Sequence, residues 1–225
     1  MSVYTGACQL TETAHRFTPE AAGVLAAVVA NLSSLCDLNL AWADFDRGGG
    51  DGVGSVGLVL LGLAGLRKLE VLDLSGNALQ LEDARALAVL LAGCVEGRGG
   101  GMRRLILRNC RIEEACAEAL AAGLKGVRAL EVLDVSCNAL RVGGCRSLMR
   151  ALQPPTGGPA AGNSLRRLLI ARNDITAEAA NDVERTLKAS ARLEECDFRG
   201  NALLACSVRL CLQSAAPSAC TCLFF

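Results

Sequence analysis

The sequence predicts an α/β solenoid, an open horseshoe in which parallel strands line the concave face and helices cover the convex face. Three observations lead to this fold: one short motif recurs along the chain, its side chains alternate with period two, and apolar residues spaced four apart follow each copy. The composition agrees, because 52% of the 225 residues are hydrophobic and only 3% are aromatic. A core of leucine, alanine and valine is therefore expected, and intrinsic disorder is excluded.

The motif occurs in two alternating versions. The first reads LEVLDLSGNAL from Leu69, LEVLDVSCNAL from Leu130 and LEECDFRGNAL from Leu193, and the second reads MRRLILRNCRI from Met102 and LRRLLIARNDI from Leu165. With two looser copies, the units start near residues 7, 35, 69, 102, 130, 165 and 193, so the basal spacing is 28 residues. Longer spacings place loop insertions at 46–54, 93–101 and 153–164. We predict one domain over residues 1–225, with a C-terminal cap or tail at 204–225.

Each unit is expected to consist of a strand and a helix. In the strand, Leu72 and Leu74 should point into the core, while Val71, Asp73 and Ser75 point outward. Thr18 and Thr176 stand where helices are expected to begin. In the helix, a small or polar residue lies four positions after the motif, at Ala21, Asp83, Cys116, Gly144, Ala179 and Ser207. Apolar residues lie eight and twelve positions after it, at Leu25, Val29, Leu87, Leu91, Leu120, Leu124, Leu148, Leu152, Val183 and Leu187, which forms one stripe on a helix.

One polar column marks the turn out of each strand. It contains Asn77, Cys110, Asn138, Asn173 and Asn201, whereas Ala43 and His15 occupy it in the first two units. An amide at this place can satisfy backbone groups of the turn that would otherwise be buried without a partner. We therefore interpret these asparagines as structural.

The pattern LxxLxLxx(N/C)xL, the helical unit of 28 residues and the two alternating versions resemble the leucine-rich-repeat family, in its ribonuclease-inhibitor-like subclass. The resemblance implies a right-handed leucine-rich-repeat solenoid whose concave strands bind another protein. The subclass includes ribonuclease inhibitors, the sensor arms of NOD-like receptors, Ran GTPase-activating proteins and actin regulators, so it implies partner binding without naming the partner.

The outward residues of the strands are the candidate binding residues. They comprise Trp42, Asp73, Arg104, Arg108, Asp134, Arg167, Arg172, Asp197 and Arg199. One interpretation is a mixed-charge docking surface whose arginines bind acidic groups of a partner. The alternative is a ladder of surface ion pairs that compensate one another. Trp42, the only tryptophan, either anchors an interface or covers a terminal repeat.

Several functions are not expected. Lys plus Arg equals Asp plus Glu at 23 each, which argues against a nucleic-acid partner. The sole histidine, His15, completes neither a catalytic set nor a zinc site, and there is no CxxC, so we expect no enzyme, no metal and no cofactor. The glycine-rich run at 46–54 lacks the GxxxxGK[ST] pattern of a phosphate loop. GTPase activation of the Ran type stays an alternative function, although no residue can be assigned to it.

The twelve cysteines and the chain ends bear on location. The polar residues 1–17 do not resemble a secretory signal, and the apolar runs at 21–32 and 56–66 are too short to span a membrane. We therefore expect reduced, mostly buried thiols in the cytoplasm or the nucleus. The last four residues from Cys222 resemble a prenylation box, with Cys220 as a candidate palmitoylation site. A lipid-anchored scaffold is thus a further alternative, and the competing interpretation is an apolar tail that folds over the last repeat.

Overall fold

The computed structural model of the chain describes residues 17–45, 53–93, 101–125, 127–153, 164–202 and 212–224. Seven short strands form one parallel sheet in chain order: β1 (Asp37–Asn39), β2 (Val71–Asp73), β3 (Arg104–Ile106), β4 (Val132–Asp134), β5 (Arg167–Leu169), β6 (Glu195–Asp197) and β7 (Thr221–Leu223). The helices are α1 (Pro19–Ala30), α2 (Ser55–Leu63), α3 (Leu81–Gly93), α4 (Glu114–Leu124), α5 (Arg141–Leu152), the 3-10 turn η1 (Ala177–Ala179) and α6 (Ala180–Ala189).

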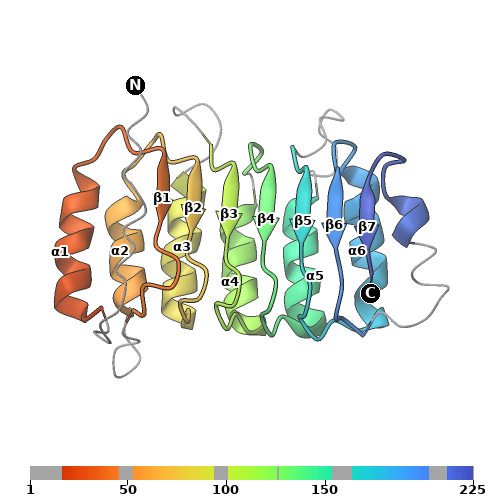
Figure 1. Cartoon of the computed structure of the whole chain (residues 1–225), viewed down its shortest axis with the longest axis horizontal. Coiled ribbons are helices and arrows are strands. Elements are labelled where there is room, and N and C mark those ends of the chain that lie inside the picture. The colour runs from red at the N-terminus through yellow and green to blue at the C-terminus, as the bar shows by residue number, and fades with distance from the viewer. Residues whose placement is uncertain are drawn as a thin grey trace.

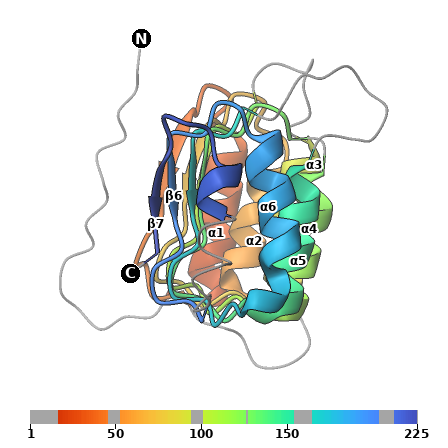
Figure 2. The ribbon, with the colours of Figure 1, turned by 90° about the vertical axis from the view of Figure 1, so that its right-hand side faces the viewer.

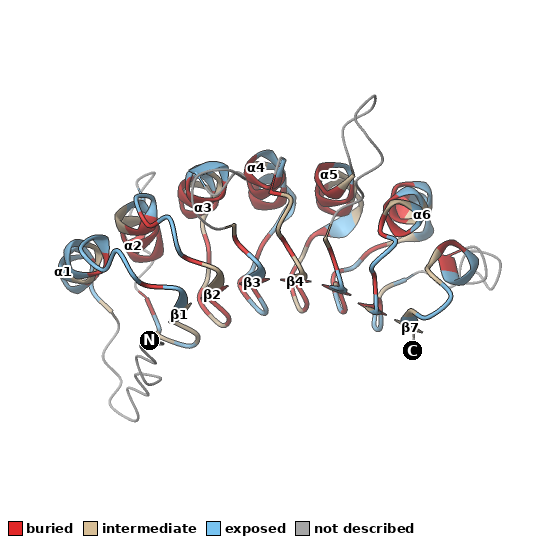
Figure 3. Ribbon diagram, turned by 90° about the horizontal axis from the view of Figure 1, so that it is seen from above, coloured by how far each residue is buried: buried red, intermediate tan, exposed pale blue. Residues whose placement is uncertain are grey.

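The elements form two layers, with the sheet on one side and the helices on the other (Figures 1 and 2). Seen from above, the array bends so that the strands lie on the inner side of the arc and the helices on the outer side (Figure 3). A helix is wider than a strand, so stacking units of both kinds curves the array toward the strands. The predicted α/β solenoid is confirmed.

The core of the sheet is a column of leucines. The middle residues of successive strands are register partners, and Leu72, Leu105, Leu133 and Leu168 are completely buried. Burying a leucine side chain stabilises a fold by about 1.5–3 kcal/mol. Leu74 is buried as predicted, but Ser75 and Ser136 are also buried rather than outward. These serines already lie in the turn, where an aspartate two residues earlier accepts their backbone N–H.

The helices bury the predicted stripe from α3 to α6, including Leu87, Leu120 and Leu148. The first helix differs, because Ala22 is buried and the predicted Ala21 is exposed. Among the described elements, α1 packs on one side only, against α2, so its buried stripe is narrow. Helices approach closely where glycine faces the preceding unit: a Cβ on Gly123 in α4 would collide with Ala88 in α3.

The two predicted helix starts behave differently. The Thr18 side chain accepts the backbone N–H of Ala21 at 3.3 Å and so caps α1. Thr176 precedes η1 instead of an α-helix, and its buried hydroxyl has no hydrogen-bond partner among the described residues. The 3-10 geometry of the first turn accounts for this difference, because it moves the backbone N–H groups away from the capping position.

The asparagine column is structural, as predicted. Asn138 donates from Nδ2 to the carbonyl oxygens of Leu107 and Val135, each at 2.8 Å, and its Oδ1 accepts the N–H groups of Cys110 (2.9 Å) and Ile112 (3.0 Å). Asn201 repeats this pattern one pair of units later. In the unit where cysteine replaces asparagine in this column, the Cys110 thiol donates to the Leu74 carbonyl at 3.2 Å. In Asn77 and Asn173, by contrast, Oδ1 has no partner among the described residues.

The C-terminal tail continues the solenoid beyond the last predicted unit. Residues 212–215 are helical, and β7 then pairs with β6 in parallel register. The Phe224 ring stacks on Phe198 with centroids 5.6 Å apart, which fastens the chain end to the last repeat. The strand expected in the unit from residue 7, together with His15, Ser207 and most of the three insertions, lies outside the described residues.

Candidate functional site

The outward side chains of the strands and of the turns after them form the concave face. Their columns run along the sheet because the strands are in register, so a residue of one strand has its equivalent about 4.8 Å away on the next. The residues that the units carry at equivalent positions therefore decide which charged side chains lie next to each other. The face lies on the inner side of the arc (Figure 3).

The aspartates of this face are engaged in the turns. Asp73, Asp134 and Asp197 each accept the backbone N–H two residues later, at 2.8, 2.9 and 3.0 Å. Asp134 retains only 8% of its accessible surface and Asp197 only 7%. The carboxylates of β4 and β6 are therefore mostly covered, although they belong to the predicted outward column. Their main contact is with their own backbone, which leaves little carboxylate surface for a partner.

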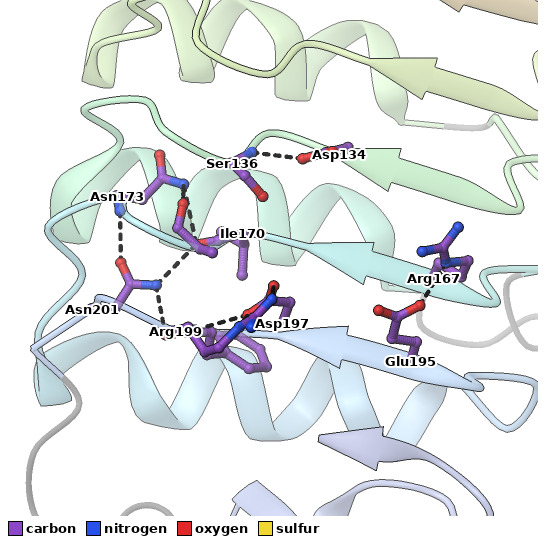
Figure 4. A network of polar contacts seen from close by, with 11 residues as sticks. Asp134, Ser136, Arg167, Ile170, Asn173, Glu195, Asp197, Arg199 and Asn201 are labelled. Atoms are coloured by element: carbon purple, nitrogen blue, oxygen red, sulfur yellow. Dashed lines mark hydrogen bonds and ion pairs between the residues drawn. The ribbon is translucent and has the colours of Figure 1, made fainter. Parts of the chain in front are cut away.

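Asp197 is also held by an arginine in the turn that follows its strand. The Arg199 guanidinium donates from Nε to Oδ1 at 3.0 Å and from NH2 to Oδ2 at 2.7 Å (Figure 4). Burial alone would raise the pKa of the Asp197 carboxyl, but the hydrogen bonds and the charge of Arg199 together lower it below its usual value. The positive charge of Arg108 acts in the same direction.

Part of the predicted ladder of ion pairs is present. On the concave face, Arg167 donates to Glu195 on the next strand at 2.7 Å (Figure 4). A second row lies one residue before the strands, where Arg103 bridges Glu70 (3.2 Å) and Glu131 (2.7 Å). Arg166 likewise pairs with Glu194. All of these arginines are about half exposed, so each pair contributes about 0–1 kcal/mol.

Three arginines of the concave face are different. Arg104, Arg108 and Arg172 are exposed, and none of their guanidinium groups forms an ion pair or hydrogen bond with another residue that the structure describes. The stem of Arg172 lies against the next turn, where a Cβ added to Gly200 would be 2.8 Å from its Cγ. These guanidinium groups retain all their donors for a partner.

Trp42 marks the N-terminal end of the described face. Its side chain is 66% exposed, and its ring lies against the backbone of Gly76, where a Cβ would collide with the ring. Both residues have a positive φ, 60° for Trp42 and 75° for Gly76, as the turn requires. The ring thus covers part of the neighbouring turn and also presents a large apolar surface to solvent.

A shallow hollow lies over β3, β4 and β5. It has a volume of about 260 Å³ and is lined in part by Arg104, Ile106, Val132 and Arg167. This volume is below the usual 300–1,000 Å³ of pockets for drug-sized ligands. The hollow is therefore better suited to one side chain of a protein partner than to a cofactor.

The candidate lipid-attachment residues lie at the sheet edge. Cys222 is half-buried in β7 opposite Cys196, and Cys220 is half-buried just before the strand. A lipid transferase would reach the Cys222 thiol only after β7 leaves the sheet. Of the eight described cysteines, all free thiols, four are buried, three are half-buried and Cys36 is exposed. No described helix is long and apolar enough to cross a membrane.

Sequence reasoning located the face but missed which of its charges are free. The column positions of the arginines were visible, but a partner such as Glu195 for Arg167 depends on how the side chains extend between strands. The meeting of Cys196, Cys220 and Cys222 was also missed, because a search for CxxC spacing does not find thiols from two strands. The CxC spacing at 220–222 was the only available indication.

Comparison with known proteins agrees with the repeat pattern. A family model described as "Leucine Rich repeat" matches residues 65–88. A ribonuclease inhibitor from Sus scrofa is 29% identical over 135 residues, which cover 59% of this chain and 27% of that protein. The matched part thus spans about a quarter of the curated relative. Taken with the seven in-register strands and the outer helices, these matches support a leucine-rich-repeat fold of the ribonuclease-inhibitor-like kind.

Proposed function

We propose that this chain is a non-catalytic protein-interaction module that binds a partner on its concave face. The observation that carries the proposal is the set of three exposed arginines, Arg104, Arg108 and Arg172, without an ion-pair partner among the described residues. The aspartates of the same face are engaged by backbone N–H groups or by Arg199. The charge available for binding is therefore positive, although the chain as a whole is neutral.

The available donors favour an acidic protein partner. A guanidinium group binds a carboxylate through two parallel hydrogen bonds, and this geometry is more specific than a point charge. The hollow beside Arg104 can receive an acidic or aromatic side chain. At the N-terminal end, the exposed Trp42 ring offers apolar area of the kind enriched at the centres of interfaces.

The role printed for the relative does not fit this charge pattern. A ribonuclease binds a polyanion, so its substrate-binding surface carries cations. Those cations would meet the free arginines of this face. We therefore propose a partner of acidic character and do not carry ribonuclease inhibition over to this chain.

The test is a combined reversal of Arg104, Arg108 and Arg172 to Glu in the full chain. A matched control reverses Arg67, Arg185 and Arg192, three exposed arginines outside the concave face, and so changes the net charge equally. Partners are captured from the native cells, and the affinity of the main partner is then measured with purified proteins. The concave variant should lose at least about thirtyfold in affinity, or about 2 kcal/mol.

The control variant should bind as the unmodified chain does, and both variants should keep the same far-ultraviolet circular dichroism. Equal loss in the two variants would show that net charge alone matters. An unchanged affinity in the concave variant would refute the proposed surface.

GTPase activation and lipid anchoring remain predictions. Acceleration of GTP hydrolysis by the purified chain would establish the first. Mass spectrometry of the C-terminal peptide from native cells decides the second, because an unmodified Cys222 with the chain intact to Phe225 excludes prenylation.

A further inference from the structure

The leucine column of the sheet ends in cysteine. The middle residue is Leu38, Leu72, Leu105, Leu133 and Leu168 in the first five strands, but Cys196 in β6 and Cys222 in β7. The two cysteines are direct register partners at the C-terminal end of the sheet, where β6 and β7 lie side by side (Figure 1). Leucine at both positions would continue the hydrophobic core, so core packing alone does not explain why cysteine stands there.

A third cysteine points to the same place. Cys220 stands two residues before Cys222, and residues two apart on a strand face the same side of a sheet. The Sγ atoms of Cys196 and Cys222 are 2.9 Å apart, and the Sγ of Cys220 lies 3.9 Å from each of them. Three sulfur atoms from two adjacent strands therefore form a compact triangle at the edge of the core.

We propose that Cys196, Cys220 and Cys222 form a binding site for a thiophilic d10 metal ion, with Cu⁺ as the best match. With metal–sulfur bonds of about 2.3 Å, thiolates around one ion are about 3.8–4.0 Å apart. Two sides of the triangle already have this length. The third side widens when the thiols become thiolates, because like charges repel one another.

Metal binding at this site requires no change of oxidation state. Burial raises the pKa of the Cys220 thiol to about 11 and also raises the pKa of the Cys196 thiol. Binding forms three metal–sulfur bonds, breaks three S–H bonds and releases three protons to solvent. The affinity therefore increases with pH.

The number of ligands distinguishes among the ions. Within the described residues, the cluster contains three cysteines and no histidine or carboxylate. Soft thiolates select Cu⁺ and Zn²⁺, but structural Zn²⁺ normally takes four protein ligands. Cu⁺ is stable with three thiolates, whereas Zn²⁺ here would need a water molecule as its fourth ligand. We therefore expect tighter binding of Cu⁺.

A bound ion would fasten the chain end to the solenoid. It would link β6 to β7 through side chains in addition to the backbone ladder, and it would occupy the Cys222 thiol. Lipid attachment to Cys222 and metal binding would thus exclude each other.

The experiment titrates the reduced full chain with Cu⁺ under anaerobic conditions against a competing Cu⁺ chelator, and separately with Zn²⁺. The test variant combines Cys196→Leu with Cys222→Leu, which restores the leucines of the other strands. The control combines Cys36→Ser with Cys137→Ser and so removes the same number of thiols outside the cluster. A Cys220→Ser variant leaves the leucine column untouched and guards against a folding defect in the test variant.

One high-affinity Cu⁺ equivalent is expected in the unmodified chain and in the control. The leucine variant should lose at least a hundredfold in affinity, and Cys220→Ser at least tenfold. Equal Cu⁺ affinity in all four proteins would overturn the site. So would a Cys196–Cys222 disulfide in the chain isolated without reductant, if the reduced chain then binds no Cu⁺. Tighter binding of Zn²⁺ than of Cu⁺ would overturn the choice of ion.

Discussion

Replacement of Asn138 by alanine tests whether the asparagine column stabilises the solenoid through buried hydrogen bonds. The change removes two donated and two accepted bonds between 2.8 and 3.0 Å, and also a longer bond from Nδ2 to the Ser136 carbonyl at 3.3 Å. The backbone groups left without a partner belong to Leu107, Cys110 and Ile112, which are at most 1% exposed, whereas the Val135 carbonyl still accepts from Asn173 Nδ2 at 2.9 Å.

The magnitude follows from the number of unsatisfied groups. A buried polar group that loses its partner costs about 1–3 kcal/mol, and partial relaxation brings three such groups to about 3–5 kcal/mol in total. Asn201→Ala removes the equivalent four bonds, but Asn201 is half-exposed and water can replace some of them. Its cost should be about half as large.

Urea unfolding followed by circular dichroism measures both variants, and their m-values should be compared because repeat arrays can unfold in parts. Asn138→Asp keeps the acceptor oxygen but places a second carboxylate oxygen against the Leu107 and Val135 carbonyls in a buried site, so it should cost at least as much as alanine. A cost below about 1 kcal/mol for Asn138→Ala, or one no greater than that of Asn201→Ala, would refute the reasoning.

Two further predictions concern charge and turn geometry. Since Arg199 lowers the pKa of Asp197, the stability from this pair is present above the usual carboxyl pKa and is lost as the pH falls through the lowered value. In Arg199→Ala the midpoint of acid unfolding should therefore move to higher pH. An unchanged midpoint in an acid titration would contradict the pairing. Gly76→Ala should cost about 1–2 kcal/mol from its positive φ and should displace the Trp42 ring, changing the tryptophan fluorescence. Gly200→Ala has a similar φ and serves as the control, because its emission should stay that of the native chain.

The fold could be predicted because every unit carries the same local information. Leu72 and Leu133 occupy the same motif position, and both are completely buried register partners of their neighbours. Prediction failed where an element lacks a repeat on one side. Ala22 replaces Ala21 in the stripe of α1, and the tail that was expected only as a cap adds β7 to the sheet.

The candidate binding face could be predicted in outline, but not the state of its charges. Arg104 and Arg167 occupy the same column and have the same residue type, and in the aligned repeats they differ only in their neighbours. The strand after Arg167 offers Glu195 in the same column, whereas the strand after Arg104 offers Val132. The ion pair also requires both side chains to extend toward each other, and only the tertiary structure determines this.

The sequence by itself determined the repeat, the position of each strand and helix, and the asparagines of the turns, because these depend on residues close together in the chain. The tertiary structure decided which arginines are free, which aspartates are buried and that three cysteines meet. Those properties depend on atoms of neighbouring units, such as Cys196 and Cys222, which are distant in the chain and become neighbours only when the strands stack in register.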